Sequence, residues 1–315
     1  MKSLFILGNG FDLAHELPTK YKDFHKYLKT NYPKALKINP SFNIESTIMP
    51  DGEEVFDKDE VVAFIMDVIS MTEGEGNDWR NIENSLGKLD FNKYFDDLSL
   101  LFDEDDDKEL FRMAYRHEDI SSNFRKVILN IKNLFSDWVN TIDINNSCSI
   151  PAFEKLFNEG NSIFLTFNYT TVLEYLYNID DPFHIHGVQH SDIIIGHGET
   201  LDEDEGYRYI GSEYELMAIH TQLRKDTDKI ITQSKEFFEG VSDIDKIYSH
   251  GFSFSNVDLP YIKEICSKQN TTNVTWYLND DYDNETIRDN FLSIIKQCGF
   301  EGNFDVYSIK DSLII

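Results

Sequence analysis

The sequence predicts a doubly wound α/β fold, in which helices cover both faces of a mostly parallel sheet, with a large helical insertion. Short apolar runs alternate with helical segments over residues 151–315, which is the pattern of parallel strand–helix units. Another apolar run opens the chain and stops at a glycine-rich turn, and residues 40–150 are mainly helical in pattern. We therefore expect residues 1–39 and 151–315 to form one α/β domain and residues 40–150 to be inserted into it.

The elements of the expected α/β domain follow one another in a regular order. Residues 4–7 form an apolar strand, and a helix with one apolar face follows over residues 14–28, or from Pro18 onward. Further strands are expected at residues 163–167, 183–186, 193–195, 244–248, 274–278 and 304–307. Helices are expected between them at residues 171–177, 214–238, 258–266 and 284–295.

The inserted segment shows helical periodicity over residues 55–139 and no good strand candidate. Its position makes it the expected place for control or for oligomerisation. Two acidic runs, 103–107 and 202–205, are expected to be solvated loops, because blocks of like charge repel one another.

Composition indicates a well-packed globular protein of the cytoplasm. Hydrophobic residues make up 41% of the chain and aromatic residues 14%, which argues against disorder. No apolar run approaches the roughly 20 residues that span a bilayer, and the first run is too short for a signal peptide. The three cysteines lack C-x-x-C spacing, which excludes a four-cysteine zinc site. A formal charge of −28 repels nucleic acid, so neither a membrane nor a nucleic acid is an expected partner.

The residues after the first strand, Gly8-Asn9-Gly10-Phe11-Asp12, are typical of a site for a nucleotide phosphate. Glycines let the backbone turn and let a ligand approach its amides, and the N-terminus of the next helix favours an anion. The third glycine of the dehydrogenase pattern G-x-G-x-x-G is Leu13 here, so hydride transfer is not expected. A plain tight turn between strand and helix is the alternative.

Polar residues also follow three later strands. Thr166 and Asn168 lie at the end of one strand, His184, His186 and Gly187 at the end of the next, and the run Ser249-His250-Gly251-Phe252-Ser253 follows a third. Ligands of open parallel sheets bind beyond the carboxyl ends of the strands, so we expect these residues around one crevice. Taken singly, Asn168 could instead cap a helix, and His186 could be a core histidine.

The opening segment ILGNGFDLAHELPTKYKDF resembles the AbiH family of bacteriophage abortive infection proteins. The segments WRNIENSLG, FNYTTVLEYLY with HIHG, and YSHGFSFSNVDLPYIKEI also resemble that family, so the resemblance extends to about residue 266. The family is in turn distantly similar to sirtuin-like NAD-binding domains. Those domains share a Gly-x-Gly loop, an Asn after a Thr-x motif, and a His before Gly, which match Gly8 and Gly10, Thr166 and Asn168, and His186 and Gly187.

The resemblance implies a Rossmann-like, sirtuin-like domain that binds NAD and hydrolyses it to nicotinamide and ADP-ribose without a metal. It assigns the catalytic roles to Asn168, which would position a water, and to His186, which would act as a base. The cofactor-binding residues that it implies are Gly8, Asn9, Gly10, Phe11, Asp12, Thr166, Gly187, Gly251 and Ser253. Two departures stand out: Thr170 replaces an aspartate of sirtuins, and the sirtuin zinc module is absent, which argues against protein deacylation.

Other functions stay open on the sequence alone. A module that senses NAD or ADP-ribose without turnover is one, and Thr170 favours it slightly. A metal hydrolase is another, because His184, His186, His190 and His197 are of the right type for zinc or manganese. A nuclease ranks lowest, because of the negative charge. The expected partners are NAD or a related nucleotide, together with a second copy of the chain or another defence protein.

Overall fold

The computed structural model describes residues 1–73, 79, 82–99, 107–157, 161–200, 209–279 and 285–309. Two compact units make up the chain: a sheet unit of residues 1–19, 139–194 and 226–315, and a helical unit of residues 20–138 and 195–225. The sequence-based division places the boundaries at 39 and 150 and assigns residues 195–225 to the α/β part. Residues 103–106 and 202–205 of the two acidic runs lie outside the described residues.

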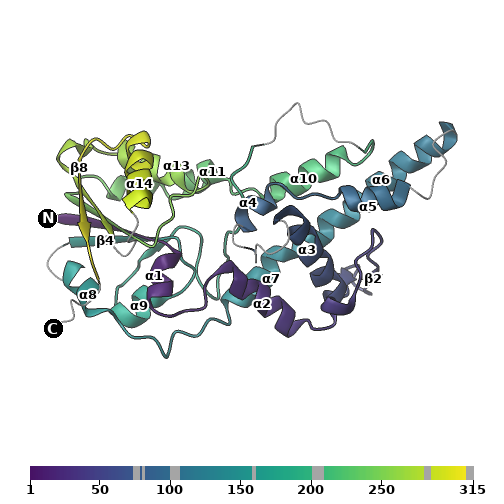
Figure 1. The fold of residues 1–315 in the computed structure, drawn as a ribbon, viewed down its shortest axis with the longest axis horizontal. Coiled ribbons are helices and arrows are strands. Elements are labelled where there is room, and N and C mark those ends of the chain that lie inside the picture. The colour runs from purple at the N-terminus through teal and green to yellow at the C-terminus, as the bar shows by residue number, and fades with distance from the viewer. Residues whose placement is uncertain are drawn as a thin grey trace. The chain divides into compact units, whose positions relative to one another are not determined.

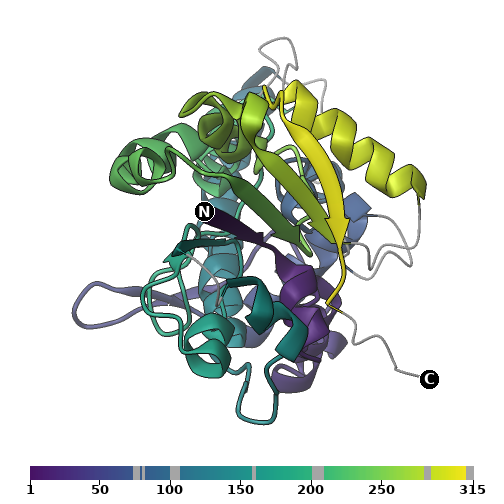
Figure 2. The same ribbon diagram turned by 90° about the vertical axis from the view of Figure 1, so that its left-hand side faces the viewer.

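The sheet unit contains a six-stranded sheet in which all strands are parallel (Figures 1 and 2). Its strands are β1 (Lys2–Leu7), β4 (Asn161–Thr166), β5 (Phe183–His184), β6 (Lys246–His250), β7 (Thr275–Asn279) and β8 (Asn303–Tyr307). Their order across the sheet is β5-β4-β1-β6-β7-β8. Counted along the chain, this order is 3-2-1-4-5-6, so the direction of winding reverses between β1 and β6. The expected parallel α/β sheet is thus confirmed.

Apolar side chains of β1 pack on both faces of the sheet. Leu4 and Ile6 point into one apolar cluster, which also contains residues of α11, α12, α13 and α14. Phe5 lies on the opposite face, where its ring stacks on Phe164 at 5.0 Å and on Tyr248 at 4.9 Å. Successive side chains of a strand point to opposite faces, so the apolar and buried run of residues 4–7 in β1 belongs at the centre of a sheet that is covered on both sides.

Helices of the sheet unit follow most of its strands (Figure 1). They are α1 (Asn9–Ala14), α8 (Pro151–Phe157), α9 (Val172–Tyr177), α11 (Thr227–Gln233), α12 (Lys235–Gly240), α13 (Leu259–Ser267), the short 3-10 helix η2 (Thr271–Asn273) and α14 (Glu285–Gln297). The aromatic side chains of Phe153 in α8 and Tyr177 in α9 pack together at 5.2 Å, and Phe153 packs on Phe5 at 5.7 Å.

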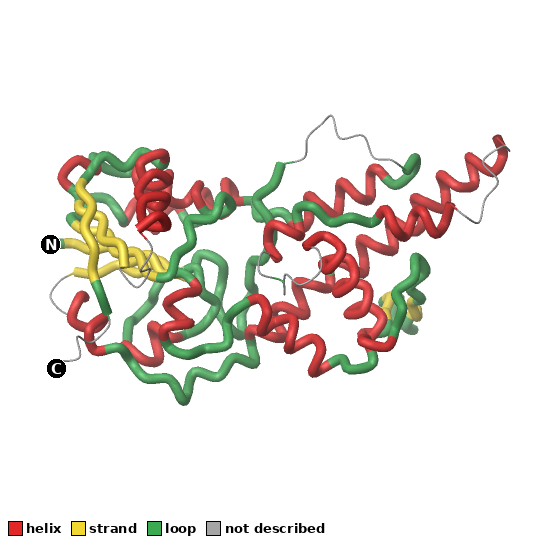
Figure 3. The backbone as a smooth tube through the Cα atoms, viewed as in Figure 1, coloured by secondary structure: helices red, strands yellow, loops and turns green. Residues whose placement is uncertain are grey.

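The helical unit contains most of the longer helices and one small sheet. Its helices are α2 (Tyr21–Asn31), η1 (Ala35–Lys37), α3 (Lys58–Glu73), α4 (Ile82–Leu86), α5 (Asn92–Ser99), α6 (Asp107–Ile128), α7 (Asn130–Val139) and α10 (Glu213–Leu223). Strands β2 (Ser46–Ile48) and β3 (Glu54–Phe56) form an antiparallel hairpin of their own, which is drawn in yellow in Figure 3. Among the helices that the structure describes, none combines the length and the apolar character needed to cross a membrane.

Three sequence-based expectations about elements are wrong. The first helix begins at Asn9 and ends at Ala14, and α2 begins at Tyr21, so residues 14–28 are not one helix and the alternative start from Pro18 onward is closer to the structure. Residues 193–195 are not a strand. The segment 214–238 is divided among α10, α11 and α12, because the chain turns at Arg224 and the side chain of Asp226 accepts a hydrogen bond from the Lys229 amide to begin α11.

Candidate functional site

The candidate site lies at the carboxyl ends of β4, β1 and β6, next to the reversal of winding. Leu7, the last residue of β1, is in register with Thr166 of β4 on one side and with His250 of β6 on the other. The three loops that follow these strands therefore start at the same level. This is the place where open parallel sheets bind their ligands.

The glycine loop after β1 packs directly against the loop after β6. The Gly8 amide donates to the His250 carbonyl at 3.0 Å, and the Gly10 amide donates to the Gly251 carbonyl at 3.0 Å. A Cβ on Gly10 would lie 2.4 Å from Gly251 Cα, and one on Gly8 would lie 2.7 Å from Phe252 Cα. Close contact between two backbones thus requires both glycines, and it already uses two of the amides expected to face a phosphate.

Asp12 lies at the centre of a buried hydrogen-bond network. The Asn168 side-chain amide donates to Asp12 Oδ1 at 2.8 Å and to the Gly8 carbonyl at 3.0 Å. The Thr170 hydroxyl donates to Asp12 Oδ2 at 2.8 Å. Burial raises the pKa of Asp12 to about 7, although the hydrogen bonds from Thr170 and Asn168 and the nearby charge of His184 lower it in part. The structure thus joins the opening motif to the segment after β4.

His184 holds the backbone of this segment in place. Its Nδ1 lies 3.0 Å from the Asn168 carbonyl, and its Nε2 lies 2.9 Å from Glu174 Oε1 in α9. Each ring nitrogen of His184 thus lies opposite an oxygen, which fixes the orientation of the ring. The remaining predicted residue of the segment, Thr166, accepts a hydrogen bond from the Asn168 amide at 3.1 Å through its hydroxyl.

His186 is buried against the ring of Phe167, the chain neighbour of Asn168. Its ring meets the edges of Phe167 at 5.4 Å and Tyr261 at 5.7 Å, and its Nε2 lies 3.6 Å from Asp258 Oδ1. Gly187 follows with a φ of +84°, and a Cβ there would lie 2.0 Å from the Asp192 carbonyl oxygen. The glycine after His186 is therefore required by backbone packing as well.

Two buried histidines pack against Phe11 of the glycine loop: His250, which belongs to the predicted run after β6, and His15, which the sequence reasoning did not single out. His15 donates from Nδ1 to the Phe11 carbonyl at 2.7 Å, so its Nε2 is the acceptor for the Tyr177 hydroxyl at 2.6 Å. Burial lowers the pKa of His15, and burial together with the charge of His15 lowers the pKa of His250 to about 4. Both rings are thus neutral near pH 7, and Phe11 packs between them at 4.6 Å and 5.6 Å.

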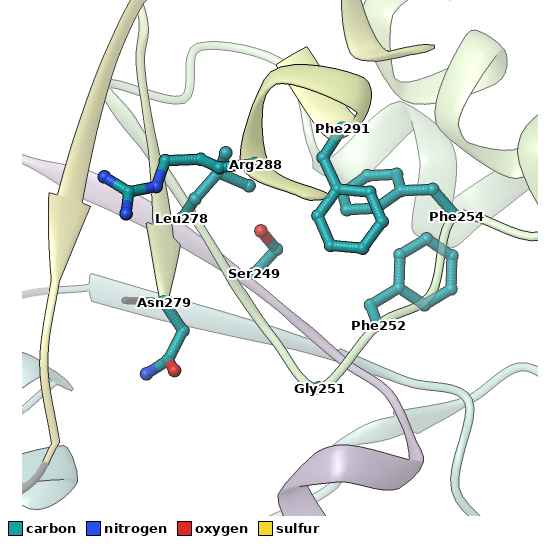
Figure 4. A pocket seen from close by; sticks show the side chains of 8 residues that line it. All are labelled: Ser249, Gly251, Phe252, Phe254, Leu278, Asn279, Arg288 and Phe291. Carbon is teal, nitrogen blue, oxygen red and sulfur yellow. The ribbon is translucent and has the colours of Figure 1, made fainter. Parts of the chain in front are cut away.

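A small pocket opens at the ends of β6 and β7 (Figure 4). Its lining residues are Ser249, Gly251, Phe252, Phe254, Leu278, Asn279, Arg288 and Phe291. Figure 4 shows the three phenyl rings together on one side of Ser249, with Asn279 and Arg288 on the other. Water molecules can be centred in only about 10 Å³ of this space, which is room for about one.

Sequence reasoning found only part of this pocket. Gly251 lines it, whereas Ser253 is exposed and lies outside its lining. Asn279 was missed, although it is the polar last residue of an apolar strand and so fits the rule that led to Asn168. Arg288, on α14, carries no comparable sequence signal.

The histidines of the metal alternative lie in different surroundings. His184 contacts Asn168 and Glu174, His186 faces Asp258, and His197 belongs to the helical unit, where its Nε2 donates to the His220 carbonyl at 2.9 Å. Within the described ranges, no group of three or more His, Cys, Asp or Glu side chains is placed to hold a metal ion.

Comparison with known proteins gives one match. The family model described as "Bacteriophage abortive infection AbiH" matches residues 4–280, which is most of the chain. No curated protein and no solved structure matches the chain.

Proposed function

The chain belongs to the AbiH family of bacteriophage abortive infection proteins, and on that premise we propose that it binds NAD and hydrolyses it to nicotinamide and ADP-ribose. NAD depletion would halt an infected cell, which is the outcome that abortive infection requires. The proposed fold relationship is a Rossmann-like, sirtuin-like one, and the strand order 3-2-1-4-5-6 supports it.

One observation carries this proposal: an amide side chain is fixed at the reversal of winding in the sheet. Asn168 is buried, and Asp12 and Gly8 hold it through two hydrogen bonds at 2.8 and 3.0 Å. A fixed amide at the ligand-binding edge of a parallel sheet is suited to position a reactant, because prior orientation lowers the entropic part of the barrier.

The reaction needs little acid assistance. Water attacks the anomeric carbon of the nicotinamide ribose while the bond from that carbon to the ring nitrogen breaks, and the bonding electrons leave with nicotinamide, which becomes neutral. The water gives up one proton to a base. We assign the base to His186, whose Nε2 lies 3.6 Å from Asp258 Oδ1, a carboxylate that would stabilise the protonated ring.

Two observations favour the second candidate, a sensor that binds NAD or ADP-ribose without turnover. Thr170 replaces the aspartate of sirtuins, and its hydroxyl is used inside the protein, on Asp12. The amides of Gly8 and Gly10 are engaged by the loop after β6. A nucleotide phosphate would have to displace this loop to reach these two amides.

The test is nicotinamide release from NAD by the purified protein, followed by chromatography. We expect release by the wild type and its loss, on the order of 100-fold or more, in Asn168→Ala and His186→Ala. Asn161→Ala is the matched control, because Asn161 is an exposed residue of the same type at the opposite end of β4. Calorimetric NAD binding without release would identify the sensor, and the absence of both would reject the two candidates.

A further inference from the structure

We infer that Asp12 is a positioning residue, which acts with the Gly8 carbonyl to hold the Asn168 amide in one orientation and leave its oxygen as the group that meets the substrate. The identity of the substrate rests on the proposed function, whereas the orientation rests on contacts within the sheet unit.

The hydrogen-bond partners of Asn168 allow only one orientation of its side chain. An amide NH₂ group has two hydrogens to donate, and here one goes to Asp12 Oδ1 and the other to the Gly8 carbonyl. Both partners are acceptors, so a flipped amide would turn its own oxygen toward two other oxygens deep in the protein. Proteins rarely leave such buried acceptors unpaired, so the flipped orientation is strongly disfavoured.

The oxygen of the same amide is left for a ligand. Among the residues that the structure describes, none donates a hydrogen bond to Asn168 Oδ1, although the side chain is only 6% exposed. An oxygen of this kind accepts from a hydroxyl or a water and repels a phosphate. The group that Asn168 binds is therefore a ribose hydroxyl or the attacking water, and not the pyrophosphate.

Asp12 itself is too enclosed to contact a ligand directly, although the family resemblance includes it among the cofactor-binding residues. It is 2% exposed, and each of its two oxygens already accepts a hydrogen bond, from Asn168 and from Thr170. The charged groups nearby are His184 and, behind it, Glu174. If Asp12 takes up a proton on Oδ2, the Thr170 hydroxyl can rotate to accept it, and Oδ1 still accepts from Asn168. The orientation of Asn168 thus survives the titration of Asp12.

A pair of variants at position 12 tests the inference through activity. Asp12→Leu fills the space but removes the acceptor, and we expect it to lower nicotinamide release on the order of 100-fold. Asp12→Asn keeps an acceptor oxygen toward Asn168 and should restore most of the rate. In an Asn168→Ala background, Asp12→Leu should have little further effect, because interacting residues are not additive. Equal losses in both variants at position 12, or additive losses, would show that Asp12 acts on the substrate directly.

A second measurement separates this inference from the proposed function. In NMR spectra of the labelled protein, the side-chain NH₂ hydrogens of Asn168 should exchange slowly with water in the wild type and in Asp12→Asn, and rapidly in Asp12→Leu. The exposed Asn161 supplies the rapid reference within each spectrum. Rapid exchange at Asn168 in the wild type overturns the inference even if NAD is hydrolysed. Slow exchange at Asn168 supports the orientation of its amide even if NAD is not hydrolysed.

Discussion

The buried carboxyl of Asp12 lowers the stability of the folded protein once it is charged. Its pKa of about 7 in the folded protein lies above the ordinary value of 3.8, because burial penalises the charged form. A raised carboxyl pKa contributes stability that is complete below about pH 4 and is lost as the pH rises through about 7. At neutral and alkaline pH, Asp12 therefore lowers the stability of the folded protein. A buried carboxyl that lowers stability is expected where the residue serves a binding or catalytic site.

Asp12→Asn should expose this cost. The variant has no charge to bury, so its free energy of unfolding relative to the wild type should rise between about pH 4 and about pH 7 and then level off. The gain at the upper end is at most about 4 kcal/mol, from roughly three pKa units at 1.36 kcal/mol each. Urea unfolding of both proteins at about pH 5 and about pH 8 measures it. The same difference at both pH values would show that Asp12 has an ordinary pKa.

At the scale of elements, the glycines join the loop after β1 to the loop after β6. Gly251 has a φ of +62°, and a Cβ on it would lie 2.3 Å from Gly10 Cα. Gly251→Ala should therefore destabilise the protein by roughly 3 kcal/mol or more, through backbone strain and overpacking together. The control is Gly240→Ala at the end of α12, where a Cβ meets nothing within 4 Å and the change should stay within about 1 kcal/mol. Thermal unfolding compares the two, and similar small effects would mean that the loops separate readily.

Sequence reasoning predicted best the elements whose apolar side chains are buried, because burial imposes a recognisable apolar pattern on the sequence. All six strands of the large sheet were expected close to their observed positions, and four of them, β1, β4, β6 and β7, contain buried apolar residues. The β2–β3 hairpin was missed, since its strands are short and largely exposed and carry no alternating pattern. Helix α1 was missed as an element of its own, because Gly8-Asn9-Gly10 reads as a turn, whereas the helix begins within that turn at Asn9.

For the candidate site, the strand ends that come together could be predicted from the sequence, but the directions of their side chains could not. Parallel strands bring their carboxyl ends to one edge, so Gly8, Asn168 and Gly251 were expected together, and the register of Leu7 with Thr166 and His250 explains why they meet. The direction of each side chain depends on contacts that no local pattern specifies. For this reason the sequence did not indicate that Asn168 donates to Asp12, or that His186 lies against Tyr261.

At the scale of the whole molecule, the sheet unit depends on distant parts of the chain. Strand β1 pairs with β4, where Ser3 is in register with Ser162, and with β6, where Leu4 is in register with Ile247. The central strand is therefore completed only when segments on both sides of the helical unit's main segment, residues 20–138, have come together. The site forms between these same strands, so it exists only in the assembled sheet unit and in no single segment.

The overall charge of −28 gives the last prediction, which concerns how the proposed nucleotide binds. A strongly acidic protein repels an anionic ligand over a distance that shrinks as salt is added. NAD affinity should therefore increase as the ionic strength rises from about 20 to about 200 mM, opposite to the behaviour of basic sites that bind phosphates. ADP-ribose lacks the cationic nicotinamide ring and carries more net negative charge, so its affinity should increase more steeply. Calorimetric titration of both ligands measures the two slopes. Affinity that falls with salt would instead reveal a local cationic site strong enough to outweigh the charge of the whole chain, and Arg288, at the pocket beside β7, would be the first residue to replace.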